Sequence, residues 1–208
     1  MPTAAAPYQS SILLVEDDAA LSGYLASALG SKGYRVLCAA DRPAAVACMA
    51  QAHAPALVLL DLGLPPHPST MREGLQALQE ILRAQPGTKV LVLTGQDESA
   101  AAHEAVRLGA FDFLTKPCAL DTLLQALRRA DLFAREEARM ALEGETRLSI
   151  TARMDEGPKE AGALVEEQLL RRSFAAAGYN VTEAARHLGL AREHVYYYLN
   201  KYGIRRPD

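Results

Sequence analysis

Residues 57–65 read LVLLDLGLP. Four apolar residues are followed by Asp61 and then by a segment with a glycine and a proline, which is typical of a turn. The run LVLL has no polar alternation, which is typical of a central parallel strand that is covered on both faces. An aspartate at the end of such a strand lies at the carboxyl edge of the sheet, where parallel α/β folds place their functional groups. This stretch therefore predicts a buried parallel sheet with a polar site at its edge.

Short apolar runs of the same kind recur on both sides of this stretch and alternate with amphipathic segments of helical period. This alternation is the pattern of βα units, and it predicts an α/β domain with a five-stranded, parallel, doubly wound sheet. We expect strands at Ser11–Glu16, Tyr34–Cys38, Ala56–Asp61, Lys89–Thr94 and Ala110–Thr115. We expect helices at Asp18–Ser31, Arg42–Ala52, Glu73–Ala84, Glu98–Leu108 and Ala119–Ala134.

Charged and hydroxyl side chains stand where four of these strands end. The first strand ends in Glu16 and Asp17, the third in Asp61, the fourth in Thr94, and Lys116 follows the fifth. If these strands are neighbours, the side chains converge, and the carboxylates repel one another unless a hard cation such as Mg²⁺ binds between them. A lysine and a hydroxyl beside a metal complete a site that is able to receive a phosphoryl group.

Four motifs occur together at these strand ends, and together they are specific. They are LLVEDD at 13–18, LVLLDLGLP at 57–65, VLVLTG at 90–95 and FLTKP at 113–117. In this order and at these intervals they resemble the receiver domain of two-component response regulators, over roughly residues 10–131. The resemblance implies a flavodoxin-like fold.

The resemblance also implies a nucleophile and a metal site. Asp61 is expected to be the phosphoacceptor, a carboxylate that attacks the phosphohistidine of a sensor histidine kinase. Asp17 is expected to bind Mg²⁺ directly, Glu16 through a water molecule, and the backbone carbonyl of Gly63 to complete the ligand set with Asp61.

Three further residues receive roles from the same resemblance. Thr94 is expected to be the switch hydroxyl, Phe113 its aromatic partner, and Lys116 the cation that binds the phosphate, followed by a cis Pro117. One departure from the family pattern is visible, because the segment from Pro65 to Gly74 is longer than the usual loop beside the phosphoacceptor.

Other interpretations of these residues remain open at this point. An acidic cluster at a strand end is often only a solvated helix start, and Phe113 suits a core in any case. A metal-dependent phosphatase with an aspartate nucleophile is a further class. However, the sequence Asp61-Leu62-Gly63 lacks the second acid that such enzymes place two residues after the nucleophile.

Helical periodicity returns near the C-terminus, where we expect helices at Leu164–Ala177, Thr182–Leu188 and Arg192–Tyr202. The stretch LLRRSFAAAGYNVTEAARHLGLAREHVYYYLNKYGI resembles the Fis-type helix-turn-helix of many response regulators, which implies binding to double-stranded DNA. In the first of these helices, Val165, Leu169 and Ala176 form the more apolar stripe. We expect this stripe to pack within one copy of the chain, although it is also suited to pairing two copies.

The last helix is the candidate recognition helix, since a helix-turn-helix places its second helix in the major groove. Its side chains Val195, Leu199 and Tyr202 should face the core. The DNA-binding candidates are Arg192, His194, Tyr196, Tyr197, Asn200 and Lys201. Arg192 is the best candidate for a base-edge contact.

The C-terminal segment departs from its family in ways that keep a second interpretation open. Tyr197 and Tyr198 stand where basic residues are common, and Ala191 replaces the usual polar helix cap. The alternative is a small helical dimerisation module, with the receiver signalling through protein–protein contacts. Segment 161–208 is nevertheless the only part of the chain with more basic than acidic residues.

These patterns predict a receiver domain at 9–131, a linker at 132–160 and a helix-turn-helix domain at 161–208. The early part of the linker is able to prolong the preceding helix. The linker is far shorter than the roughly 100 residues of a typical domain, and the sequence has no GxxxxGK[ST] phosphate loop. We therefore expect no ATPase and no enzyme, but a phosphorylation-dependent transcription factor that forms a homodimer on activation.

The composition agrees with a protein of the cytoplasm. The chain has 208 residues and a net charge of −3, and its longest apolar run, Ala54–Leu60, falls well short of the roughly 20 residues of a membrane helix. The segment Met1–Ser10 has no basic residue, so it does not resemble a secretory signal. Cys38, Cys48 and Cys118 form no CxxC pair, and we expect them to be reduced.

Overall fold

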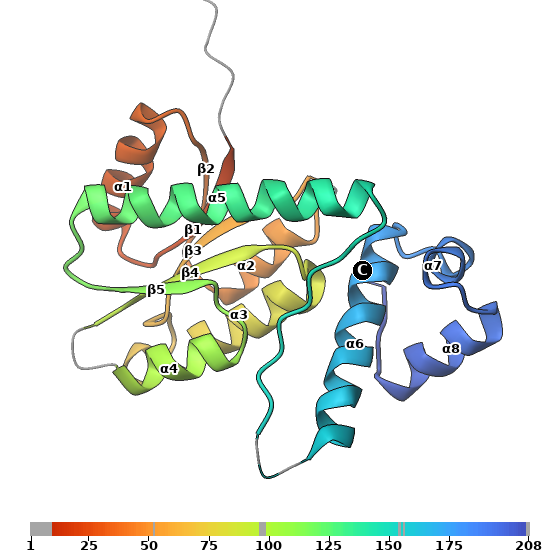
Figure 1. The fold of residues 1–208 in the computed structure, drawn as a ribbon. Coiled ribbons are helices and arrows are strands. Elements are labelled where there is room, and N and C mark those ends of the chain that lie inside the picture. Colours follow the sequence, from red (N-terminus) through yellow and green to blue (C-terminus); the bar gives the residue numbers. More distant parts are fainter. Residues whose placement is uncertain (1–9, 52, 96–98, 154, 156, 207–208) are drawn as a thin grey trace, which may run out of the picture.

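The computed structural model describes residues 10–51, 53–95, 99–153, 155 and 157–206. Its five strands form one sheet in the order β2-β1-β3-β4-β5, and all neighbouring strands are parallel (Figure 1). The strands are β1 (Ser11–Val15), β2 (Arg35–Ala39), β3 (Leu57–Asp61), β4 (Lys89–Thr94) and β5 (Asp112–Thr115). Each lies within two residues of its predicted bounds, so the predicted parallel sheet is confirmed.

Helices cover both faces of this sheet, as in a doubly wound fold (Figure 1). One face carries α1 (Ala19–Ser31) and α5 (Leu120–Leu142), and the other carries α2 (Arg42–Met49), α3 (Arg72–Ala84) and α4 (Ser99–Arg107). A single turn of 3-10 helix, η1 (Pro68–Thr70), precedes α3. The helix predicted from Glu98 is described from Ser99, and Glu98 lies outside the described residues.

The core consists of two layers because side chains of each strand alternate between the faces of the sheet. In β1, Ile12 and Leu14 pack under α1 and α5, whereas Leu13 and Val15 pack under α2 and α3. All four are fully buried. Each such side chain contributes roughly 1.5–3 kcal/mol by leaving water, which explains why the central strands lack polar alternation.

Polar side chains cap the starts of two helices of the sheet domain. The Asp18 carboxylate accepts hydrogen bonds from the backbone amides of Ala20 and Leu21, and Asp41 accepts one from Ala44. These caps satisfy amides that have no partner within the first turn.

The two helices that flank the linker are longer than predicted. Helix α5 continues from the predicted end at Ala134 to Leu142, and α6 (Pro158–Ala176) begins before the predicted Leu164. The extension of α5 agrees with the expectation that the early linker prolongs this helix. It is held by the Glu137 carboxylate, which lies 2.6 Å from the Lys89 ammonium at the start of β4. Met154 and Glu156 of the linker lie outside the described residues.

Helices α6, α7 (Val181–Leu188) and α8 (Arg192–Lys201) share a small core of their own. The face of α6 that enters it carries Leu170 and Phe174, which are spaced by one turn. The expectation that the stripe of Val165, Leu169 and Ala176 packs inside one copy is wrong, since Val165 is exposed. The reason is geometric, because α7 and α8 cover the neighbouring face of α6.

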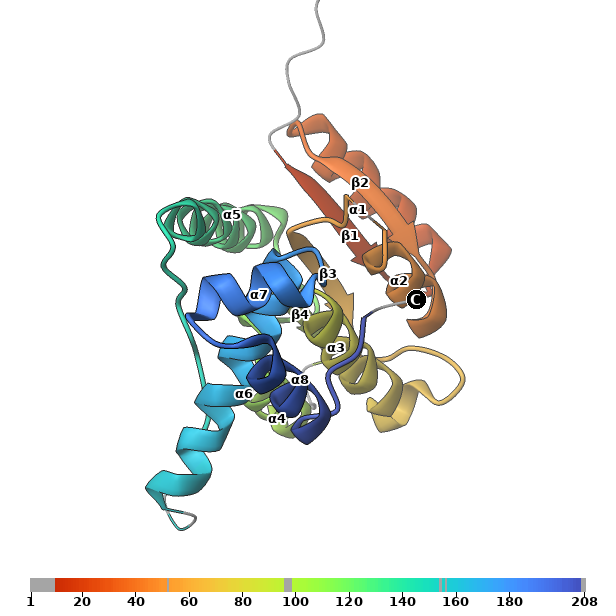
Figure 2. The ribbon, with the colours of Figure 1, turned by 90° about the vertical axis from the view of Figure 1, so that its right-hand side faces the viewer.

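Figures 1 and 2 place α6–α8 at the end of the sheet where β4 and β5 begin, beside α3 and the second half of α5. Tyr179 lies in the turn between α6 and α7. Its hydroxyl donates a hydrogen bond of 2.9 Å to the carbonyl of Ala84, the last residue of α3. Among the described residues, no helix is long and apolar enough to cross a membrane. The three cysteines are free.

Candidate functional site

The sheet order brings the ends of β1, β3 and β4 together. Strand β3 lies between β1 and β4, with Val15 beside Leu60 and Asp61 beside Leu93. Glu16 follows the last residue of β1, Asp61 is the last residue of β3, and Lys116 follows β5. Side chains from distant parts of the sequence therefore meet at the carboxyl edge, as expected for this fold.

Lys116 connects the two buried acids of this edge. Its ammonium nitrogen lies 2.8 Å from Oε2 of Glu16 and 3.0 Å from Oδ2 of Asp61. Glu16 is 3% exposed and Asp61 is 8% exposed, so both charges are largely removed from water. Since charges of this kind are unfavourable without a partner, Lys116 stabilises the pair.

The pKa values of Glu16 and Lys116 are both raised, but for different reasons. Burial raises the pKa of Glu16, and the charge of Asp61 raises it further, while the hydrogen bond from Lys116 opposes both. Burial alone would lower the pKa of Lys116, but its hydrogen bonds to Glu16 and Asp61 outweigh burial, so this pKa is raised. The lysine therefore stays charged at neutral pH.

Three carboxylates of this edge are close enough to share a cation. Glu16, Asp17 and Asp61 each offer one oxygen atom, and the three atoms lie within 4.8 Å of one another. Asp17 is exposed, whereas the other two are buried, which leaves one side of the cluster open to water. Carboxylate oxygens with room for water molecules are the environment that Mg²⁺ prefers, so the donor set fits this ion.

The structure also describes the three remaining predicted site residues, Gly63, Thr94 and Phe113. Gly63 packs against the Asp61 carboxylate, because a Cβ atom built on Gly63 would lie 3.6 Å from Oδ2 of Asp61. Thr94 is buried at the end of β4, with its hydroxyl 3.5 Å from the Gly95 carbonyl oxygen. Phe113 is 36% exposed on the edge strand β5, so part of its ring lies at the surface.

The extended segment that follows β3 has a definite conformation. Its Pro65–Pro66 bond is cis, as is Lys116–Pro117, and Met71 precedes α3 with a left-handed φ of 53°. Gly74 packs against the backbone of Leu62, and a Cβ atom there would lie 2.4 Å from Cα of Leu62. Only glycine permits this approach, which anchors the first turn of α3 beside Asp61.

The predicted DNA-binding residues lie on the surface of α8. Its core side chains Val195 and Leu199 are buried. The residues exposed on this helix include Arg192, His194, Tyr196, Tyr197, Asn200 and Lys201. As expected, no side chain caps the helix at Ala191.

Lys201 has partners within the C-terminal helices. Its ammonium group lies 2.8 Å from Oε1 of Glu166 in α6, and the same oxygen accepts a 2.7 Å hydrogen bond from the Tyr202 hydroxyl. These contacts raise the pKa of Lys201 and lower that of Glu166. The structure therefore uses Lys201 to join α8 to α6.

One charged cluster was not predicted from the sequence. Lys89, Glu137 and Arg172 come from β4, α5 and α6 and meet in one group, with Arg172 3.4 Å from Glu137. The available signal was Lys89 itself, since it is a lysine at the start of a strand whose six residues are all buried. A buried lysine requires a partner, but the sequence does not indicate which acid supplies it.

Comparison with known proteins gives a family match over the sheet domain. Residues 12–128 match the model of the response regulator receiver domain. The solved structure of the receiver domain of NtrX from Brucella abortus is 33% identical, with a TM-score of 0.54, and the similarity covers 58% of this chain and 98% of that one.

Two curated relatives illustrate how far the similarity extends. The regulatory protein AtoC of Escherichia coli is 34% identical over 119 residues, which are 57% of this chain but only 24% of AtoC. The photosynthetic apparatus regulatory protein RegA of Rhodobacter capsulatus is 30% identical over 182 residues, which are 88% of this chain and 86% of RegA. The similarity to RegA therefore extends into the C-terminal helices. By contrast, the chain spans only about a quarter of the length of AtoC.

Proposed function

Because the chain belongs to the response regulator receiver domain family, we propose that Asp61 accepts a phosphoryl group from a sensor histidine kinase. The observation that carries this proposal is the meeting of Lys116 with Asp61 and Glu16 at the carboxyl edge of the sheet. An aspartate held beside a fixed cation, with further carboxylates for a metal, is suited to phosphoryl transfer.

In the proposed reaction, a carboxylate oxygen of Asp61 forms a bond to phosphorus while the bond from phosphorus to the imidazole nitrogen of the kinase histidine breaks. The electron pair of the broken bond stays on that nitrogen. Lys116 lies 3.0 Å from Asp61, where it stabilises negative charge on the transferred group. Thr94 is the proposed hydroxyl donor to the phosphoryl oxygens after transfer, and Phe113 the aromatic residue that moves with it.

Glu16, Asp17 and Asp61, with the backbone carbonyl of Gly63, would hold Mg²⁺ at this site. The ion would neutralise charge on the phosphoryl group and relieve repulsion among the carboxylates. The support for this assignment is the closeness of the three carboxylate oxygens. Glu16 keeps its contact with Lys116 and orients that side chain.

A mass measurement tests the phosphoacceptor. The full chain is incubated with Mg²⁺ and acetyl phosphate, a small phosphodonor, and its intact mass is recorded. We expect the wild type and the control Asp121→Asn, a change at an exposed residue of α5, to gain one phosphoryl group. Asp61→Asn should gain none. A wild type that stays unmodified, or an Asp61→Asn variant modified to the same extent, would contradict the proposal.

We further propose that helices α6–α8 form a Fis-type helix-turn-helix that binds double-stranded DNA, so that the protein is a transcriptional regulator that pairs on phosphorylation. The proposed units are 9–131, 132–160 and 161–208. Support comes from the separate core of these helices and from the exposure of Arg192, Tyr196 and Asn200 on α8. The relatives named as regulators favour the same conclusion.

A gel shift across a salt series separates DNA binding from the alternative, a dimerisation module that acts through protein contacts. DNA binding should weaken steeply with salt, because each phosphate contact releases counterions. Arg192→Ala should reduce affinity by about 1–3 kcal/mol if this residue reads a base. The control Arg35→Ala, at an exposed residue of β2, should leave the DNA affinity unchanged. Absence of DNA affinity in the phosphorylated protein would favour the dimerisation module.

A further inference from the structure

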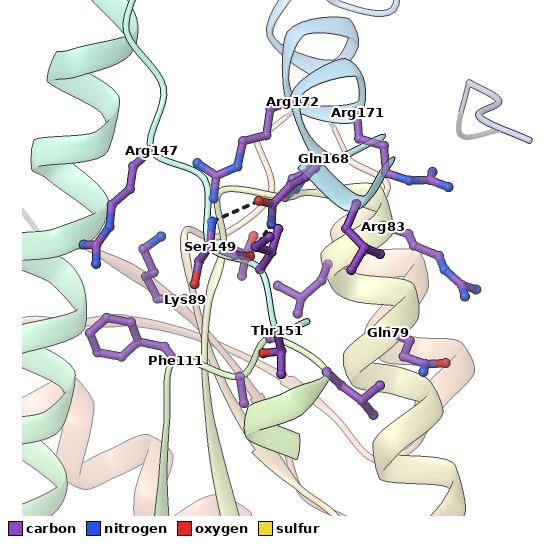
Figure 3. Close-up of a pocket in the computed structure, with 18 of the residues that line it drawn as sticks. Gln79, Arg83, Lys89, Phe111, Arg147, Ser149, Thr151, Gln168, Arg171 and Arg172 are labelled. Carbon is purple, nitrogen blue, oxygen red and sulfur yellow. Dashed lines mark hydrogen bonds between the residues drawn. The ribbon is translucent and has the colours of Figure 1, made fainter. Parts of the chain in front are cut away.

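A cavity of about 630 Å³ lies between the receiver and the C-terminal helices, beside Lys89 at the start of β4 (Figure 3). Its walls are the ends of α3 and α4, the segments around the starts of β4 and β5, the second half of α5, the linker near Ser149 and one face of α6. The cavity has the size of a small-molecule site. Lys89, in the wall of the cavity, is the first residue of β4, and Thr94, at the carboxyl edge, is the last. The cavity and the acidic site therefore lie at opposite ends of this strand and are distinct.

The lining of this cavity has more cations than acids. The cations are Arg83, Lys89, Arg107, Arg147, Arg171 and Arg172, and the acids are Glu137 and Glu167. Arg171 is paired with Glu167 at 2.8 Å, and Arg107 with Glu104 at 3.0 Å. Figure 3 shows Arg83 and Arg171 over α3 on one side of the linker, and Lys89, Arg147 and Arg172 on the side that faces α5.

On the side facing α5, one carboxylate contacts two of the three cations. A single oxygen of Glu137 lies 2.6 Å from Lys89 and 3.4 Å from Arg172. Arg147 lies with its guanidinium carbon 5.2 Å from the centre of the Phe133 ring. With Glu137 counted, this group has a surplus of two positive charges.

Two of these three cations are largely buried, whereas Arg147 is exposed. The side chains of Lys89 and Arg172 are only 8% and 14% exposed, and Nε of Arg172 is buried without a hydrogen-bond partner. The pKa of Lys89 is lowered by burial and then by Arg172 and Arg147, although Glu137 opposes this. Buried donors without partners indicate a missing acceptor, and buried like charges indicate a missing counter-charge.

We propose that this cavity binds a small phosphate-bearing anion, held by Lys89, Arg147 and Arg172 against the apolar wall formed by Phe111 and Phe133. A phosphate group fits because its charge of nearly two matches the surplus, and its three terminal oxygens accept several hydrogen bonds from guanidinium forks. The ligand touches the receiver through Lys89 and the C-terminal helices through Arg172. It therefore bridges the two parts of the chain.

The test uses inorganic pyrophosphate as the probe and the full chain with EDTA, so that metal at the acidic site plays no part. Binding is followed by calorimetry and by thermal unfolding, at an ionic strength held constant with NaCl. We expect saturable binding and a rise in unfolding temperature. The double variant Arg147→Gln, Arg172→Gln should bind at least about tenfold more weakly, because it loses two charged donors.

Three further variants identify the site and guard against misfolding. Glu137→Gln removes the competing carboxylate and should bind pyrophosphate more tightly, which a merely destabilised cavity would not do. Asp61→Asn and Arg192→Gln should bind like the wild type, because the phosphoacceptor and the proposed DNA face are separate from this cavity.

Several outcomes would overturn this inference. They are no saturable effect beyond that of NaCl, equal affinity in the wild type and the double variant, or loss of binding in Arg192→Gln. None of them depends on phosphorylation of Asp61, so failure here and failure of the proposed phosphoacceptor are distinguishable.

Discussion

Glu16 connects the lysine and the carboxylates of the acidic site. It is buried, it contacts Lys116, and it lies beside Asp61. Burial and the neighbouring carboxylate raise its pKa, so the folded protein holds a proton there more readily than a free glutamate does. A cation that shares these oxygens must compete with that proton.

We predict that Mg²⁺ affinity falls as the pH falls through the raised pKa of Glu16. The protonated carboxyl group is a weaker Mg²⁺ ligand than the carboxylate, so Mg²⁺ binding favours the deprotonated form of Glu16. Calorimetric titration with Mg²⁺ between about pH 7.5 and about pH 5 measures the effect. In Glu16→Gln the affinity should be lower and its dependence on pH shallower. Identical pH profiles for the two proteins would assign the titration to another group.

At the scale of the element, the two short C-terminal helices differ at their starts. The Asn180 side chain accepts hydrogen bonds from the backbone amides of Thr182 and Glu183 at the start of α7. Helix α8 begins after Ala191, which offers no such acceptor. No side chain therefore accepts a hydrogen bond from the first-turn amides of α8, although the His194 amide donates one of 3.1 Å to the Ala191 carbonyl.

We predict opposite effects of two matched substitutions on these helices. Asn180→Ala should destabilise α7 by about 1 kcal/mol, and Ala191→Ser should stabilise α8 by a similar amount. Hydrogen exchange measured on peptides from residues 180–202 reports each helix separately. Protection in α7 should fall in the first variant, and protection in α8 should rise in the second. A change of the same sign in both would mean that the cap is not the cause.

At the scale of the whole molecule, a few long-range contacts hold the C-terminal helices to the receiver. The Tyr179 hydroxyl bonds the Ala84 carbonyl across 95 residues of sequence, and Arg172 reaches Glu137. Tyr179 also packs edge-on against Phe174 within the C-terminal core, with ring centres 5.4 Å apart. The ring of Tyr179 thus packs within the C-terminal helices, whereas its hydroxyl contacts the receiver.

We predict that Tyr179→Phe loosens this contact and leaves the C-terminal core intact. The variant keeps the ring and loses one hydrogen bond, worth about 1 kcal/mol. Hydrogen exchange near Ala84 and in the linker should become faster, while exchange within α8 stays unchanged. Tyr24→Phe, at a tyrosine that is 60% exposed, is the matched control. Unchanged exchange near Ala84 would show that the hydroxyl does not hold the two parts together.

The sequence by itself determined the parallel sheet and the placement of polar side chains at one of its edges. Unbroken apolar runs such as 57–60 specify buried strands, and the rule that parallel strands end at one edge places Asp61 and Lys116 together. The structure agrees, with these two residues 3.0 Å apart. Such features were predictable because they follow from local periodicity and from one general property of parallel sheets.

The tertiary structure alone decided which face of α6 is buried, where α5 ends and that a charged cavity exists. The sequence of α6 offers several mixed stripes, and only the positions of α7 and α8 select Leu170 and Phe174. Likewise, Lys89 and Glu137 are 48 residues apart, and no local pattern relates them. Contacts of this kind depend on how whole helices pack against one another, because packing, and not periodicity, determines which distant side chains share a low-dielectric space.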